Sequence, residues 1–392
     1  VYSILGHLYI SWSKNNHALK YNKLALQIYN HLERPIPKSN ILHNLGISFL
    51  HLGKLDEALS YYKKSLKIKQ KYEDRLLQGS SYAEIGNLYL TKYNYTKSIF
   101  YLNRSLAIYK DFDQSFNKGL SMIFISEAYI ETGQIEKATE FIKEAGIILD
   151  EYKDPTIQGR LDNYKGIIAF YTSDMGRAIT HIENSIQQYQ SAQKPVPAFK
   201  GHLILLQFHI YNNQFDKAKV ILKKIETLEK QIKDNKFIIR YASINYLINT
   251  LKNKSDRDTG LEIIQKLSYV EKDVDHYLSF WYLTLAFSVL GEKNNAQKNL
   301  LQSQKLLKER SEQDSDKKSR EVILYTNPIN KQIIDLDVDS LKGYTDLLVK
   351  EYDTVKVSKF CPDCGYSNTD LKLLGIPEKQ IAALIILYPL LL

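Results

Sequence analysis

Residues 41–66 read ILHNLGISFLHLGKLDEALSYYKKSL. Apolar residues recur at helical spacing up to Leu52 and again from Leu55, so the stretch predicts two amphipathic helices. Between them, Gly53 stands where the first helix is expected to end, because glycine readily adopts the left-handed conformation of a helix C-terminus. The stretch therefore predicts one helical hairpin with a short turn.

The same pattern returns every 40 residues along most of the chain. One column of mainly small residues reads Gly6, Gly46, Gly86, Ser126, Gly166 and Leu206, and a column twelve residues later reads Ala18, Ala58, Ser98, Ala138, Ala178 and Ala218. A fixed period of this length indicates stacked hairpins, because one hairpin cannot bury its apolar face alone. Within the second hairpin, the columns predict that Gly46 faces Ala58 and Ser65.

The residues Leu45-Gly46, Phe49, Gly53 and Ala58 resemble the tetratricopeptide repeat family. The resemblance extends over about eight repeats, and the period of 40 exceeds the family's basic period of about 34. It implies an all-α, right-handed α-solenoid with a small C-terminal appendage, and longer helices, as in the family's subgroups that bind extended peptides. We predict three regions: the solenoid at 1–310, a capping helix and linker at 311–358, and a cysteine knuckle with an apolar, truncated end at 359–392.

Charge and composition predict a cytoplasmic protein with solvated helix faces. The 53 basic and 44 acidic residues give a net charge of +9, but the two signs are interspersed along the helices. This pattern is typical of solvated helix faces, and the alternative interpretation is a basic surface that binds an acidic partner. We expect no nucleic-acid binding. Two cysteines and no secretory signal indicate a reducing compartment.

No catalytic signature is present in the sequence. It contains no phosphate-binding G-x-x-x-x-G-K-[ST] loop, no H-E-x-x-H zinc motif and no G-x-S-x-G nucleophile turn. We therefore predict a non-enzymatic scaffold without a cofactor, apart from zinc at one local motif.

That motif is Cys361-Pro362-Asp363-Cys364-Gly365, which resembles half of a zinc ribbon. A structural zinc ion takes four ligands, and the chain holds only these two cysteines. Three interpretations stay open: an incomplete zinc knuckle completed from elsewhere, a metal-free relic, or a redox pair. The apolar run at 381–392 is shorter than the roughly 20 residues of a membrane helix, so it predicts a packed terminal helix, with the start of a membrane span as the alternative.

The resemblance also implies a binding groove. In peptide-binding members of the family, first-helix residues close to the column glycine point inward. These positions are His43, Asn44, Asn87, Arg160, Asn163, Lys200, Gln207, Asn245 and Asn249. An asparagine amide both donates to and accepts from a peptide backbone, although such residues are also tolerated on any exposed helix. Arg160 and Lys200 favour an acidic protein or peptide.

A second reading comes from residues 320–333, REVILYTNPINKQI. They resemble the end of the repeat region in large bacterial signalling proteins, with Ile323 where phenylalanine is usual. That resemblance implies a regulatory or sensor region of a kinase, nucleotide cyclase or ATPase whose catalytic module is not in this sequence. A peptide-sensing transcription regulator would need an N-terminal helix-turn-helix, and the sequence shows none.

Overall fold

A computed structural model describes residues 1–349, except 13, 173, 212–213, 230–231, 233–234, 252–255, 270–273, 326–327, 338–339, 344 and 347–348. Every regular element in these ranges is helical, which confirms the all-α prediction. None of the described helices is both long and apolar enough to cross a bilayer. The cysteine motif at Cys361 and Cys364 and the apolar run at 381–392 lie outside the described residues.

The predicted hairpins are present as eight consecutive helix pairs. The two helices of each pair pack against each other. The pairs are α1 (Tyr2–Ser11) with α2 (Asn15–Asn30), α3 (Pro35–His51) with α4 (Leu55–Lys71), α5 (Arg75–Thr91) with α6 (Tyr95–Asp111), α7 (Ser115–Glu131) with α8 (Ile135–Leu149), α9 (Pro155–Tyr171) with α10 (Met175–Ser191), α11 (Pro195–Tyr211) with α12 (Phe215–Glu229), α13 (Asn235–Leu251) with α14 (Arg257–Tyr269), and α15 (Tyr277–Val289) with α16 (Lys293–Ser311). Two short helices follow, α17 (Lys317–Tyr325) and α18 (Pro328–Asp335).

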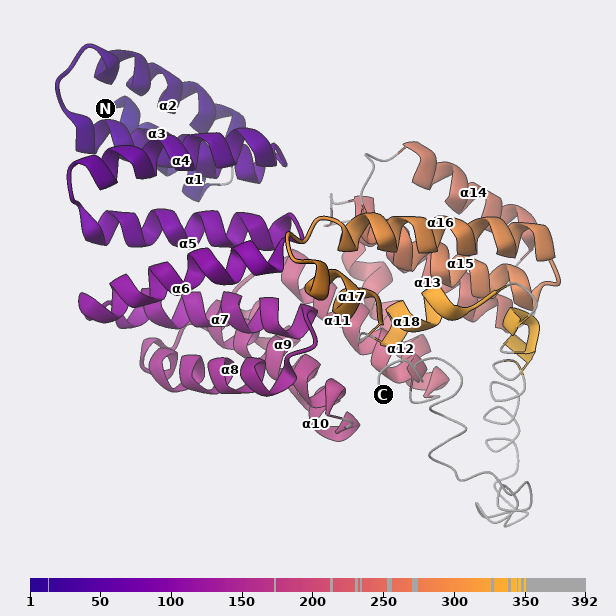
Figure 1. Ribbon diagram of the computed structural model, residues 1–392. Coiled ribbons are helices and arrows are strands. Elements are labelled where there is room, and N and C mark those ends of the chain that lie inside the picture. Colours follow the sequence, from indigo (N-terminus) through magenta and orange to yellow (C-terminus); the bar gives the residue numbers. More distant parts are fainter. Residues whose placement is uncertain are drawn as a thin grey trace. The chain divides into compact units, whose positions relative to one another are not determined.

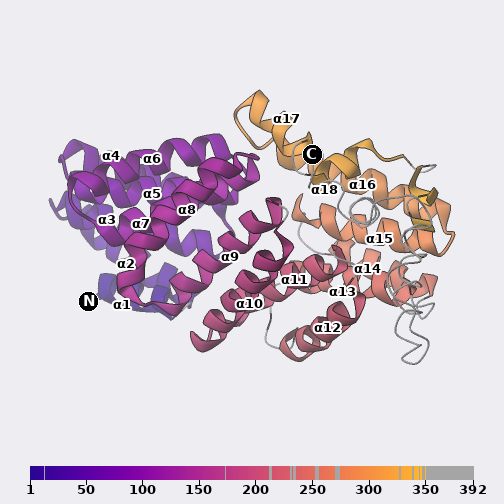
Figure 2. The same ribbon diagram turned by 90° about the horizontal axis from the view of Figure 1, so that it is seen from below.

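These elements form two compact units. Unit 1 holds Val1–Tyr152 and the short segment Gln313–Asp316, and unit 2 holds Lys153–Glu312 and the described residues from Lys317 onward. Helices α1 to α8 therefore belong to unit 1, where they follow one another in layers (Figure 1). Helices α9 to α16 belong to unit 2, where Figure 2 shows α9, α10 and α11 in succession.

The segment Gln313–Asp316 joins unit 1 through one buried carboxylate. Asp314 accepts hydrogen bonds from the backbone nitrogen of Thr96 at 3.0 Å and from its hydroxyl at 2.8 Å. Ser315 donates to the Asn94 side chain at 3.0 Å. The two bonds to Thr96 fall on the first turn of α6, where backbone N–H groups lack helical partners and an anion is favoured. A residue more than 200 positions away thus supplements the cap of this helix, where Asn94 accepts from the Lys97 backbone nitrogen at 3.1 Å.

Many turns between consecutive helices contain a residue with a left-handed backbone, and from Gly53 to Gln193 these residues are spaced 20 positions apart or a multiple of 20. Gly53 adopts a left-handed backbone angle of φ 74°, which confirms the predicted turn, and Gly133 adopts the same conformation with φ 68°. The same conformation recurs at turns without glycine, at Glu73, Tyr93, Asp113, Lys153 and Gln193. Side chains with a Cβ resist this region, so the packing of the flanking helices must hold these turns in place.

The column glycines lie where the two helices of a hairpin approach closely. A Cβ atom added to Gly46 would lie 2.5 Å from the ring of Tyr62, and one added to Gly86 would lie 2.6 Å from Leu102. The group nearest to Gly46 is therefore the Tyr62 ring, not Ala58 or Ser65 as the columns predicted. Tyr62 occupies the position four residues after Ala58, which is one turn further along the same helix face.

Serines of the second helices form a bond that repeats through the fold. Ser65 donates to the carbonyl of Ser39 at 2.7 Å, Ser185 to that of Gly159 at 2.7 Å, and Ser303 to that of Tyr277 at 2.8 Å. Each bond joins residues that are 26 positions apart. The serine at this position of the repeat therefore ties the second helix to the start of the first.

We expect Ser185→Ala to lower the free energy of unfolding by about 1 kcal/mol, because it removes one buried hydrogen bond. The matched control is Ser191→Ala at the end of the same helix, whose hydroxyl bond to Gln188 is exposed. Urea denaturation of both variants checks the prediction. Equal losses in the two variants would show that the Ser185 bond contributes nothing specific.

Candidate functional site

First helices of neighbouring hairpins pack directly on one another in both units. Helix α1 contacts α3, and α5 contacts α7, in unit 1, while α13 contacts α15 in unit 2. In these pairs the first helices lie closer to each other than the second helices do. We call the side of α9, α11, α13 and α15 that faces away from the second helices the first-helix face of unit 2. These four helices carry most of the predicted groove residues, and their place on this face stays a prediction.

On this face, Gln207 of α11 and Tyr282 of α15 are joined by a hydrogen bond. The Gln207 amide nitrogen donates to the tyrosine hydroxyl at 2.7 Å, across 75 residues of sequence. Tyr282 is buried, and burial raises the pKa of its hydroxyl, so the group stays neutral at physiological pH. The hydrogen bond from Gln207 and the positive charge of Arg240 on α13 partly offset this rise in the Tyr282 pKa. The Arg240 guanidinium donates to the Asp275 carbonyl at 3.4 Å.

Asn245 and Asn249 lie one turn apart on α13 and are both half-buried. The Asn249 amide nitrogen approaches the Asn245 side-chain oxygen at 3.3 Å, which leaves further donors and acceptors on both amides. Lys200 is exposed on α11, and its ammonium lies 4.6 Å from the centre of the Phe237 ring. These residues give the face polar groups with a positive bias.

The remaining predicted residues are distributed over both units. Arg160 and Asn163 are half-buried on α9 of unit 2. His43, Asn44 and Asn87 belong to unit 1, on α3 and α5, and all three are half-buried. We therefore describe the predicted groove as two separate sets, one in each unit.

In unit 1 the set borders a buried polar cluster that the sequence did not reveal. Burial lowers the pKa of His43 to about 3, so its ring is neutral, and its Nδ1 atom is buried without a hydrogen-bond partner. Lys69 of α4 is fully buried, and its ammonium donates to the Ser81 hydroxyl at 2.9 Å. Burial also raises the pKa of Glu84. One feature of the sequence could have indicated this cluster: Glu84 lies 40 residues after Asn44, at the same position of the repeat.

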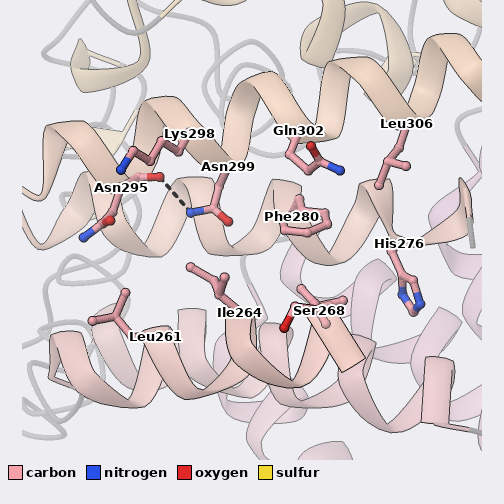
Figure 3. Close-up of a pocket in the computed structure, with 11 residues that line it drawn as sticks. Leu261, Ile264, Ser268, His276, Phe280, Asn295, Lys298, Asn299, Gln302 and Leu306 are labelled. Carbon is pink, nitrogen blue, oxygen red and sulfur yellow. Dashed lines mark hydrogen bonds between the residues drawn. The ribbon is translucent and has the colours of Figure 1, made fainter. Parts of the chain in front are cut away.

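The cavity in Figure 3 lies on the other side of the hairpins, between the second helices α14 and α16 of unit 2. Its volume is about 600 Å³. Leu261 and Ile264 form an apolar wall on α14, Phe280 of α15 forms the floor, and Asn295 and Gln302 stand on the α16 wall. None of the groove residues expected from the sequence is among the residues that line this cavity.

The described part of the chain holds no group of three or more His, Cys, Asp or Glu residues that would bind a metal. Zinc binding by Cys361 and Cys364 remains a prediction, because both residues lie outside the described ranges. The arrangement in the described residues offers hydrogen bonds, apolar contacts and positive charge, which are the means of binding a peptide or protein surface.

Comparisons with known proteins agree with the fold. Residues 38–111 match the sequence profile of the tetratricopeptide repeat. A comparison with curated proteins finds no match in sequence. Among solved structures, a Rap protein complexed with competence and sporulation factor shares 13% identity with a TM-score of 0.58, and the alignment covers 79% of this chain and 97% of that one.

Two further structures are similar. The Rap conjugation gene regulator of plasmid pLS20, in complex with the Phr* peptide, shares 11% identity with a TM-score of 0.59, over 78% of this chain and 94% of that one. A signal transduction ATPase with a tetratricopeptide repeat sensor, from Pyrococcus horikoshii, shares 16% identity with a TM-score of 0.53, over 68% and 42%. Residues 38–111 are therefore tetratricopeptide repeats, and the eight described hairpins share the all-α fold of repeat proteins of that kind.

Proposed function

We propose that this protein is a non-enzymatic scaffold that binds an extended peptide on the first-helix face of unit 2. The observation that carries the proposal is the set of half-buried amides on this face, Gln207, Asn245 and Asn249, beside the buried Tyr282 hydroxyl. The similar Rap structure in complex with the Phr* peptide supports it, because that protein shares the fold over most of this chain.

The chemistry of the face suits a peptide backbone. An extended peptide presents alternating N–H and C=O groups, and a carboxamide side chain can pair with either. The amides are held by bonds to neighbours, so less conformational entropy is lost when a ligand binds. Arg240 and Lys200 add positive charge, so we expect acidic peptides to bind more tightly and their affinity to fall as salt is added.

The test is a double variant, Asn245→Ala/Asn249→Ala. Peptides from extracts of the source cells would first be captured on the wild-type protein and identified by mass spectrometry, and one would then be titrated by calorimetry. We expect the double variant to bind it about 10- to 100-fold more weakly, which corresponds to the loss of one or two hydrogen bonds. Its melting curve should change little, because both side chains are partly exposed.

A matched control separates this face from the cavity of Figure 3. Asn295→Ala/Gln302→Ala removes two amides from the wall of that cavity and should leave the peptide affinity unchanged. If the control variant lost affinity while Asn245→Ala/Asn249→Ala kept it, the peptide would lie between the second helices and the proposed face would be wrong.

A second candidate function is the regulatory or sensor region of a larger signalling enzyme. The similar ATPase with a tetratricopeptide repeat sensor favours it, since its structure contains this fold as one part of a longer chain. The complete reading frame of the gene decides the matter: a kinase, cyclase or ATPase module in the same frame supports the sensor function, and a frame without one contradicts it.

A further inference from the structure

Unit 1 contains a groove on the outer side of its hairpins, between the second helices α2 and α4 and above α3. Its volume is about 390 Å³ and eight residues line it. The cavity of Figure 3 lies at the corresponding place between α14 and α16. Both openings have the same physical origin: the first helices of adjacent hairpins touch, at α1–α3 and α13–α15, so the second helices diverge on the opposite side.

The two grooves differ in their chemistry. In unit 1 the floor is apolar and half-buried, with Leu26, Tyr61 and Ile68 partly open to solvent. The rim carries three lysines, Lys38, Lys64 and Lys67, and none of the eight lining residues is acidic. We call these lining residues the lysine groove. The groove of unit 2, by contrast, carries carboxamides and a single lysine on its walls.

The three lysines are not neutralised within the fold. Lys64 and Lys67 are exposed and Lys38 is half-buried, and no ion pair is formed by any of them among the described residues. The Lys64 ammonium instead lies 5.0 Å from the centre of the Tyr61 ring. A recessed apolar floor with three uncompensated cations on its rim is complementary to a ligand with an apolar side and acidic flanks.

We propose that the lysine groove is a docking site for an acidic amphipathic segment of a partner protein. Apolar side chains of the segment contact Leu26, Tyr61 and Ile68, and its carboxylates pair with the rim lysines. A segment laid between two helices in this way buries one apolar stripe, which is the usual mode of helix-in-groove recognition. The site lies in unit 1 and is independent of the proposed peptide-binding face in unit 2.

The experiment uses a displayed library of random dodecapeptides, selected on the full-length wild-type protein. Clones are then counter-selected against the Lys64→Glu/Lys67→Glu variant. We expect the surviving sequences to combine Glu or Asp with apolar residues at helical spacing. A synthetic peptide of that sequence should bind the variant about tenfold more weakly or worse, because two attractive contacts become repulsive. Its affinity for the wild type should fall steeply with added salt.

The matched control is Lys137→Glu/Lys143→Glu on α8, which makes the same charge change at exposed positions of another second helix of unit 1. This control variant should keep its affinity for the selected peptide. The Asn245→Ala/Asn249→Ala variant should keep that affinity too, so the experiment tests the lysine groove separately from the peptide-binding face of unit 2. A peptide with Lys in place of Glu should regain affinity for Lys64→Glu/Lys67→Glu. Three outcomes would overturn the proposal: selected peptides without acidic enrichment, equal losses in both lysine variants, or self-association of the protein that only Lys64→Glu/Lys67→Glu abolishes.

Discussion

Replacement of Gly46 by alanine is expected to lower the free energy of unfolding by about 1–3 kcal/mol, and replacement by leucine by more. The new Cβ atom would lie 2.5 Å from Cδ1 and Cε1 of Tyr62, which is closer than carbon atoms pack in proteins. Tyr62 is 0% exposed, so its ring has no free space to move into. Either the helices α3 and α4 separate or the ring leaves its rotamer, and both cost packing energy.

The control for this prediction is Gly146→Ala in the last turn of α8, where an added Cβ atom meets nothing within 4 Å. Alanine forms helices better than glycine, so this variant should gain about 0.5–1 kcal/mol. Urea denaturation followed by circular dichroism gives both values on one scale. The contact between Gly46 and Tyr62 would be refuted if Gly46→Ala were as stable as the wild type.

The second large effect is a rise in stability with pH that depends on Lys69. Burial lowers the pKa of its ammonium from 10.5 to about 8 in the folded protein. Between these values the unfolded chain binds a proton that the folded chain does not, so stability increases as pH rises. The contribution is complete above the unfolded pKa and is lost as pH falls through about 8. From about pH 8 to about pH 9.5 it amounts to roughly 2 kcal/mol.

We therefore expect the wild type to gain this stability over Lys69→Met, which keeps the length of the side chain but cannot titrate. Lys63→Met, at an exposed position of the same helix, should follow the wild-type curve. Parallel pH profiles for the wild type and Lys69→Met, from urea denaturation, would show that Lys69 has an ordinary pKa in the folded protein.

The repeat positions were predictable because their causes are local. The 3.6-residue apolar period depends only on neighbours along the chain, and together with the 40-residue repeat it predicted all eight hairpins. The turn at Gly53 was predictable from its glycine. The turns at Tyr93 and Lys153 were not predictable in this way, since their side chains disfavour a left-handed backbone. Their conformation is set by the packing of the helices on either side.

In the candidate site, too, the sequence predicted positions along the helices but not the contacts between them. The column position of Gln207 marked it as a residue of the first-helix face, but its hydrogen-bond partner Tyr282 lies 75 residues away. The burial of Lys69 also gave no signal, because its helix carries exposed lysines before and after it. Both features depend on which hairpin lies beside which, and on the angle at which the helices cross.

The sequence by itself determined the fold class, the number of hairpins and the side of each helix that is buried, because the spacing of apolar and small residues along a helix specifies which face must leave water. Only the tertiary structure decided that Tyr62 packs on Gly46, that Asp314 supplements the cap of α6, and that second helices separate to leave a lysine-rimmed groove. These features arise from contacts between residues far apart in the chain, whose energies depend on atomic distances in three dimensions that no periodicity encodes.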